Sequence, residues 1–236
     1  MQIMKKSGTP LSGPIIPDNT MNNETLLLNF FYTMSSSLGP SNWWPGETPF
    51  EVSVGAILTQ NTNWNNVRKA ILNLKTKDLL DPRKMFLLSE NELAEFIRPA
   101  GYFRIKAKRL KNFLYFLNNE CAFNFSVLKN NTIDELRAKL LSVNGIGPET
   151  ADSIILYALN KPTFVVDAYT KRIFNRHNLV HEDIDYHDLR EFFMTCLPED
   201  PGLYSEYHAL VVIVGKKWCR KKDPLCRACP LNIYLD

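Results

Sequence analysis

The sequence predicts an all-α protein, and three observations support this fold class. From Asn22 onward, apolar residues recur at helical spacing in nearly every segment. Only Phe164–Val166 has the composition of a strand, and it is short. The chain has 236 residues, of which 45% are hydrophobic. A chain of this length buries about three quarters of its unfolded surface, so it needs no disulfide or metal to fold.

Helical periodicity predicts eleven helices along the chain. In order they are Glu24–Ser37, Pro49–Gln60, Trp64–Leu74, Asp81–Leu88, Glu90–Ile97, Arg104–Asn119, Ile133–Leu141, Ala151–Leu159, Ala168–Asn175, Tyr186–Cys196 and Leu203–Trp218. We find no internal repeat among them.

Residues 1–21 are expected to form a mobile tail before the first helix. This part of the chain is rich in Pro, Gly, Ser and Asn and has no periodicity. No segment has the length and apolarity of a membrane span, and the N-terminus lacks the apolar core of a signal peptide. We therefore expect a cytoplasmic protein with no membrane partner.

Basic residues gather in two runs, although the net charge of +3 is too small by itself to indicate a nucleic-acid partner. The first run contains Arg104, Lys106, Lys108, Arg109 and Lys111, and the second contains Lys216, Lys217, Arg220, Lys221 and Lys222. Few acidic residues are interleaved with either run. Each could be a solvated helix face, but we predict that the second run contacts phosphate.

A glycine turn separates two of the predicted helices. Gly145–Gly147 lies between Ile133–Leu141 and Ala151–Leu159. Glycine has no Cβ atom, so such a turn can adopt positive φ values and approach another backbone closely. Its amides and those of the following helix start can bind a phosphate. Pro148 and Glu149 suit the first turn of that helix. A plain helix–helix connection has the same composition.

An isolated acid follows the second of these helices. The cluster of residues 160–162, Asn-Lys-Pro, ends the helix, and Thr163–Val166 is apolar and extended. Asp167 then stands at the start of the helix Ala168–Asn175. On local sequence alone, Asp167 is typical of an N-cap. Because Asp167 follows a turn that could bind phosphate, it could also act as a reactive carboxylate next to a DNA backbone.

Aromatic and amide side chains gather earlier in the chain. Trp43 and Trp44 precede a proline, and the string LTQNTNW ends at Trp64 after an apolar helix. An enzyme that extrudes a base can recover about 1–3 kcal/mol by stacking it on aromatic rings, and an amide can fill the vacated gap. Core packing is the competing interpretation. Adjacent residues on a regular element face opposite ways, so we expect one of the two tryptophans to be free.

Together these features resemble the endonuclease III superfamily of DNA glycosylases. The helix, glycine hairpin, second helix, Pro-containing loop and Asp match its helix-hairpin-helix signature, over about residues 22–236. The strings WWP, LTQNT, RPAGYFRIKAKRL and GIGPETAD are most similar to its 3-methyladenine DNA glycosylase III branch. The resemblance implies two all-helical domains with the active-site cleft between them. Residues 44–160 would form the central domain, and residues 22–43 with 161–236 the terminal domain.

The resemblance also implies a function and a set of site residues. It implies a monofunctional DNA N-glycosylase of base excision repair that flips and releases damaged, 3-methyladenine-like bases from double-stranded DNA. We expect a monomer that associates with the nucleoid. Trp43, Trp44 and Trp64 match the base pocket, and Gln60 matches the residue that fills the duplex gap. Phosphate contact is assigned to Gly145, Ile146, Gly147, Thr150, Lys216, Lys217 and Arg220.

Glu149 distinguishes this chain from bifunctional members of the superfamily. Those enzymes carry a lysine at the matching position, which attacks the sugar C1′ and forms a Schiff base. A carboxylate cannot form an imine, so Asp167 is left to stabilise the oxocarbenium-like cation or to activate water. Glu149 could assist by orienting water or binding the cationic base, or it could only complement the helix dipole. The alternatives are a bifunctional glycosylase/AP lyase that uses Lys106 or Lys108, and a non-catalytic DNA-binding module.

Three cysteines near the C-terminus suggest a metal site. Cys219, Cys226 and Cys229 have the spacing C-x6-C-x2-C and lie among basic residues and prolines. The superfamily's iron–sulfur loop has the spacing C-x6-C-x2-C-x5-C, and the fourth ligand is missing here. The alternatives are a [4Fe-4S] cluster held by three thiolates, no metal, and a zinc site completed by a residue such as His208.

Overall fold

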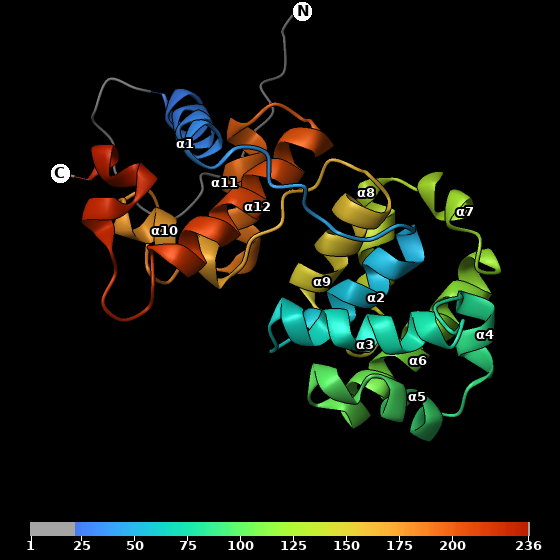
Figure 1. Ribbon diagram of the computed structural model, residues 1–236. Coiled ribbons are helices and arrows are strands. Elements are labelled where there is room, and N and C mark those ends of the chain that lie inside the picture. The colour runs from blue at the N-terminus through green and yellow to red at the C-terminus, as the bar shows by residue number, and fades with distance from the viewer. Residues whose placement is uncertain (1–21, 236) are drawn as a thin grey trace, which may run out of the picture.

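The computed structural model describes residues 22–235, and every regular element in this range is a helix (Figure 1). The predicted all-α fold class is therefore confirmed. The longer helices are α1 (Asn23–Leu38), α2 (Pro49–Thr59), α3 (Trp64–Thr76), α4 (Pro82–Leu87), α5 (Glu90–Phe96), α6 (Phe103–Cys121), α8 (Ile133–Leu141), α9 (Pro148–Ser153), α10 (Ala168–Arg176), α11 (Tyr186–Cys196) and α12 (Pro201–Lys217). The expected mobile tail, residues 1–21, lies outside the described range.

Short elements account for most differences from the predicted helices. Periodicity missed α7 (Phe125–Lys129), which is a five-residue helix, and three short 3-10 helices, η1 (Arg98–Ala100), η3 (Cys226–Ala228) and η4 (Pro230–Tyr234). Phe164–Val166 is extended and fully buried, but it has no strand partner within residues 22–235. Its extension is held by side-chain packing rather than by a sheet. None of the described helices is long and apolar enough to cross a membrane.

The helix predicted at Ala151–Leu159 is built from two kinds of turn. It starts three residues earlier, as α9, and continues as the π-helical segment η2 (Ile154–Ala158). There the Leu159 N–H donates to the Ile154 carbonyl at 3.1 Å, which is the wider i to i+5 pattern. Segments of this kind occur often at functional sites. Here the wider turn carries Tyr157, whose hydroxyl lies 2.6 Å from Nδ1 of His208.

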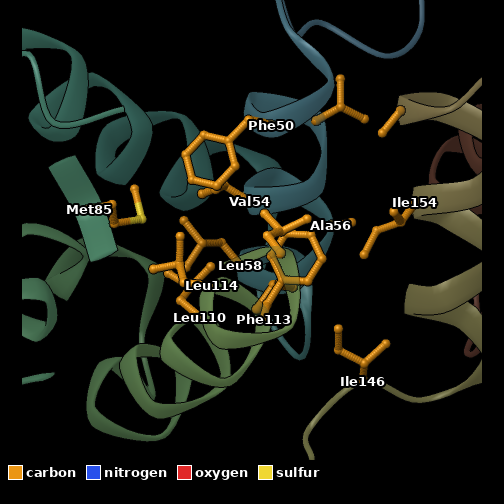
Figure 2. Packing of buried hydrophobic residues seen from close by; sticks show 14 of the residues in the cluster. Phe50, Val54, Ala56, Leu58, Met85, Leu110, Phe113, Leu114, Ile146 and Ile154 are labelled. Carbon is orange, nitrogen blue, oxygen red and sulfur yellow. The ribbon is translucent and has the colours of Figure 1, made fainter. Parts of the chain in front are cut away.

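Two hydrophobic clusters form the core. The first draws its buried residues from positions 50–159, and Figure 2 shows side chains of α2 meeting Met85 of α4 and Phe113 of α6. The second draws on α1, the segment 164–166 and helices α10, α11 and α12. Figure 1 shows the corresponding two groups of helices, with α1, α10, α11 and α12 together on the left. Leu156 of η2 belongs to the second cluster, so the π segment packs on both.

A buried ion cluster around Asp152 connects the hairpin helix α9 to its surroundings. Its carboxylate is fully buried and lies 3.1 Å from Arg137 Nε on α8 and 3.7 Å from Arg190 Nε on α11. It also accepts hydrogen bonds from Tyr186 Oη at 2.8 Å and Thr163 Oγ1 at 3.2 Å. A buried carboxylate is tolerated only when it is paired in this way. The cluster fixes the segment that leads from η2 to α10.

Asp152→Ala is expected to lower the free energy of unfolding by about 3–5 kcal/mol, because it leaves two largely buried guanidinium groups without their carboxylate. Urea denaturation measures the change. Asp183→Ala is the matched control, since Asp183 is exposed, and its expected effect is below about 0.5 kcal/mol. Equal effects of the two substitutions would show that the buried cluster contributes little to stability.

Candidate active site

Asp167 is both a helix cap and an available carboxylate. As the N-cap of α10, its Oδ1 accepts from the Thr170 N–H at 2.8 Å and from Thr170 Oγ1 at 2.9 Å. The N-cap interpretation of the sequence is thus confirmed. Only one oxygen is used, however, and the side chain is 12% exposed. The cap orients the carboxyl group and leaves Oδ2 for another contact.

His208 faces that second oxygen from a different helix. Its Nε2 lies 3.8 Å from Asp167 Oδ2, and its Nδ1 lies 2.6 Å from Tyr157 Oη. The sequence analysis did not identify His208 as a site residue, because Asp167 and His208 are far apart in the chain. The sequence feature that could have pointed to His208 is its place as a polar residue in the middle of an apolar helix. Both ring nitrogens of His208 face groups other than the three cysteines, namely Asp167 and Tyr157. The zinc site completed by His208 stays one of the alternatives given by the sequence.

Two carboxyl groups of the cleft have pKa values shifted in opposite directions. Burial alone raises the pKa of Asp167, but His208 and the hydrogen bonds from Thr170 outweigh it and hold the pKa below its usual value. Desolvation raises the pKa of Glu149, and the charge of Asp167 raises it further. Asp167 is therefore the group that stays ionised, and Glu149 is the one that protonates more readily.

The three predicted base-pocket tryptophans lie in one cluster. The ring centroids of Trp44 and Trp64 are 5.2 Å apart, and those of Trp43 and Trp64 are 6.1 Å apart. Tyr157 joins the cluster through Trp44, at 5.1 Å. These are direct aromatic contacts, so the rings fill the space between them. A base could stack between Trp43 and Trp64 only after the two rings separate.

A cavity of about 380 Å³ adjoins this cluster. Its lining includes Trp43, Trp44, Tyr157 and Glu206, but neither Trp64 nor Asp167. Trp44 packs against the first hydrophobic cluster, which does not include Trp43, and both residues line the cavity. Residues 39–46 form no regular helix or strand, so the alternation of side chains on a regular element does not apply to them. That one of the two tryptophans is free for another task stays a prediction. The cavity is large enough for a small flat ligand, but it lies beside the carboxylate rather than around it.

The glycine hairpin uses its two glycines differently. Gly145 has a φ of +96°, and a Cβ there would lie 2.3 Å from Arg109 Cγ, so only glycine fits. Gly147 has a φ of −94° and open space around its Cα, contrary to the expected positive φ. As N-cap of α9 it leaves the first amides of that helix without a side-chain cap. Ile146 differs, since its N–H already donates to the Val143 carbonyl at 3.0 Å.

Gln60 is held against the hairpin by both ends of its amide. Nε2 donates to the Gly145 carbonyl at 3.1 Å and to Thr150 Oγ1 at 2.9 Å, while Oε1 accepts from Arg109. The Thr150 hydroxyl oxygen accepts from Gln60, so a phosphate at this position would meet the Thr150 backbone amide or its hydroxyl proton. Insertion of Gln60 into a duplex gap would have to break these bonds. Asn61, next in the turn, is exposed.

The two basic runs have different roles in the structure. Lys106 is 1% exposed and donates from Nζ to the carbonyls of Leu58 and Ala100, both at 2.8 Å. Desolvation, together with the charge of Arg109, lowers the pKa of Lys106 to about 8. Buried in this way, Lys106 has no access to a DNA sugar, whereas Lys108 is exposed. A solvated face is therefore the wrong description of Lys106.

The second basic run is exposed, as the phosphate-contact prediction requires. Its exposed members are Lys216, Lys217, Arg220, Lys221 and Lys222. Lys216 Nζ lies 5.8 Å from the centroid of the Trp43 ring, so this run begins beside the aromatic cluster. Arg176 of α10 braces it, because Nη1 donates to the Arg220 carbonyl at 2.7 Å.

The three C-terminal cysteines line one small cavity of about 20 Å³, room for about one water molecule. Cys219 and Cys229 are buried, Cys226 is half-buried, and Arg176 Nη1 donates to Cys219 Sγ at 3.3 Å. Among residues 22–235, no group of three or more Cys, His, Asp or Glu side chains is arranged to hold a metal ion. As they lie, the three thiols do not fit a shared metal centre.

Known proteins similar to this chain repair DNA. A family model described as HhH-GPD superfamily base excision DNA repair protein matches residues 54–199. A candidate DNA repair glycosylase of Methanocaldococcus jannaschii is 48% identical over 214 residues, which are 90% of this chain and 97% of that protein. The range matched by the family model contains the hairpin, Glu149 and Asp167, and it ends before His208 and the three cysteines.

Solved structures with the same fold include DNA glycosylases. The H. pylori 3-methyladenine DNA glycosylase bound to 1,N6-ethenoadenine superposes with a TM-score of 0.70 at 30% identity, covering 84% of this chain and 98% of that chain. A trapped endonuclease III–DNA covalent intermediate superposes with a TM-score of 0.73 at 20% identity, covering 89% and 94%. Because the endonuclease III structure is only 20% identical to this chain, its similarity shows a shared fold and nothing about activity.

Gln60→Ala is expected to lower the free energy of unfolding by about 1–3 kcal/mol, because it removes the amide that links the α2–α3 turn to the hairpin and leaves its partners unsatisfied. Asn65→Ala is the matched control at an exposed position at the start of α3, with an effect below about 0.5 kcal/mol. Urea denaturation compares them. An unchanged unfolding free energy for Gln60→Ala would mean that the hairpin does not need this link.

Proposed function

This chain belongs to the HhH-GPD superfamily of base excision DNA repair proteins, and we propose that it is a monofunctional DNA N-glycosylase for alkylated, 3-methyladenine-like bases. The observation that carries the proposal is an oriented carboxylate, Asp167, in a cleft where Glu149 occupies the position of the lyase lysine. The family membership agrees with the resemblance predicted from the sequence motifs.

Asp167 suits the stabilisation of a cationic sugar. Base release breaks the N-glycosidic bond, the base leaves with the bonding electrons, and C1′ becomes cationic. A water oxygen then bonds to C1′ and loses a proton. A carboxylate beside C1′ stabilises this oxocarbenium-like transition state, as in glycoside hydrolysis. Because the pKa of Asp167 is held below its usual value, the group stays ionised for this role at neutral pH.

Glu149 supports the monofunctional route. It begins the hairpin helix α9, and its raised pKa sets it apart from Asp167. Two carboxyl groups with pKa values moved apart are typical of an acid–base pair. We assign Glu149 an auxiliary role in orienting the attacking water. The bifunctional alternative would need another amine, and Lys108 is the exposed candidate that the sequence analysis named.

The aromatic cluster supports an alkylated base as substrate. Such bases carry positive charge, and indole faces attract cations. Trp43 already has the Lys216 ammonium near its face, so this ring accepts a cation in the protein itself. The H. pylori glycosylase that shares 30% identity is named for 3-methyladenine and holds 1,N6-ethenoadenine. Trp43, Trp44 and Trp64 are the residues that we assign to the base.

Two surfaces are assigned to duplex DNA. The start of α9 presents backbone amides and the positive end of a helix dipole, which bind phosphate in many proteins. The exposed run that begins at Lys216 supplies positive charge. We propose that both contact the backbone of the damaged strand. Filling of the duplex gap by Gln60 stays a prediction, and it requires the release of its hairpin contacts.

The [4Fe-4S] cluster stays a prediction. The loop supplies three thiols, and the fourth thiolate of the superfamily's spacing is missing. Anaerobic reconstitution followed by iron and sulfide analysis tests it. A cluster on three thiolates would give brown protein with equal amounts of iron and sulfide, and Cys226→Ser would lower both. Colourless protein with neither element would leave the alternative of no metal.

The wild-type protein is expected to release 3-methyladenine and 7-methylguanine from duplex DNA, and Asp167→Asn to lower the single-turnover rate by about 100-fold or more. Loss of one preorganised charge-stabilising group typically costs about 10²–10³ in rate. DNA affinity, measured by fluorescence anisotropy, should be nearly unchanged in Asp167→Asn. Borohydride should trap no covalent adduct with either protein.

Each contrary result identifies a different alternative. Undiminished release by Asp167→Asn would remove Asp167 from the mechanism. A borohydride-trapped adduct would show that an amine attacks C1′ despite Glu149, which is the bifunctional reaction. DNA binding without release of any base from a panel of lesions would indicate the non-catalytic module.

A further inference from the structure

One ring nitrogen of His208 is buried beside Asp167 without a hydrogen-bond partner. The residue is 6% exposed, and within residues 22–235 its Nε2 has no such partner. The nearest charged atom is Asp167 Oδ2, at 3.8 Å. This separation is longer than a hydrogen bond, and it is within reach of a small adjustment or a bridging water. A buried polar group left in this position needs an explanation.

Tyr157 determines which way His208 presents its proton. Burial raises the pKa of Tyr157 well above its usual value, and the charge of Asp167 raises it further, so the phenol stays protonated. Its hydroxyl can donate to Nδ1, at 2.6 Å. The neutral imidazole then carries its proton on Nε2, which faces the carboxylate. The opposite tautomer would place a lone pair against Oδ2, which is unfavourable.

Asp167 has only one oxygen free for this contact. Oδ1 is occupied by Thr170, as described above, and Oδ2 faces His208. The other titratable groups facing this site are Tyr157 on η2 and Glu149 on α9, with Glu206 of α12 acting on Tyr157. Both glutamates are acidic and oppose a further negative charge. His208 is the side chain that can offer a hydrogen-bond donor to Oδ2 of Asp167.

We infer that His208 is a positioning residue for base release: its Nε2–H orients and stabilises the free oxygen of Asp167, while Tyr157 holds the imidazole in place. The inference rests on the proposed glycosylase function. The Tyr157 ring also packs on Trp44. Tyr157 and His208 therefore connect the aromatic cluster to the Asp167 carboxylate. Movement of the tryptophans around a base would therefore reach Asp167 through Tyr157 and His208.

A matched pair of substitutions separates this role from simple packing. In His208→Asn the amide can replace Nδ1 and keep the contact with Tyr157, but it does not reach Asp167. In His208→Gln the amide nitrogen can take the place of Nε2. We expect His208→Asn to lower the single-turnover rate at neutral pH by about 10- to 100-fold, the loss typical of a hydrogen bond to a charged group. His208→Gln should retain most of the wild-type rate.

The pH dependence of the rate gives a second readout. The lowered pKa of Asp167 means that the carboxylate is lost only when the pH falls through that low value. Without the Nε2–H donor the pKa of Asp167 rises, so the acidic limb of the rate profile should move to higher pH in His208→Asn. Tyr157→Phe should also move the acidic limb to higher pH, but by a smaller amount than His208→Asn. His181→Asn, at an exposed position, is the control and should match the wild type.

The outcomes are distinguishable from failure of the proposed function. Equal losses in His208→Asn and His208→Gln with an unmoved acidic limb would mean a packing role and would overturn the inference. If His208→Asn does not fold, Tyr157→Phe and His208→Gln carry the same comparison. If the wild type releases no base, the glycosylase proposal fails. In that case a carboxyl ¹³C NMR titration of Asp167 tests the inference about His208 without any activity. An Asp167 titration midpoint that is the same in His208→Asn and in the wild type would overturn the inference.

Discussion

The buried carboxylate of Asp152 is the constraint on which the arrangement of the cleft depends. It binds Arg137 from the first group of helices and Arg190 and Tyr186 from the second, and it also holds Thr163 of the connecting segment. A charge buried this deeply requires all of its partners. The path from the hairpin helix to Asp167 is therefore fixed at its middle, and this fixes the position of the Asp167 carboxylate.

The cleft is assembled from elements that belong to different cores. Asp167 comes with α10 and His208 with α12, both in the second cluster, whereas Glu149 and the tryptophans lie on or beside helices of the first. Tyr157 packs on both clusters from its π turn. Burial raises the pKa of Asp167, but His208 of α12 and Thr170 of α10 bring it below its usual value. Desolvation and the charge of Asp167 raise the pKa of Glu149, so the two carboxyl groups are shifted in opposite directions.

Several side chains that look available in the sequence are used internally. Gln60 and Arg109 link the α2–α3 turn to the hairpin, and Lys106 binds the carbonyls that end α2 and η1. Local sequence could not show this, because polar and basic residues near a helix end are equally typical of a DNA-contacting surface. Most of their partners lie 48 or more residues away in the chain, and local periodicity contains no information on such pairings.

The sequence by itself determined the all-α class, the positions of the main helices, the hairpin, Asp167 as an N-cap and Glu149 in place of a lysine. Each of these depends on spacing or on one side chain within a few residues. Only the tertiary structure decided that Oδ2 of Asp167 faces His208, that both adjacent tryptophans line one cavity, and that the three thiols line another, smaller one. These facts depend on distances between segments far apart in the chain, which packing of the two cores sets and local patterns do not encode.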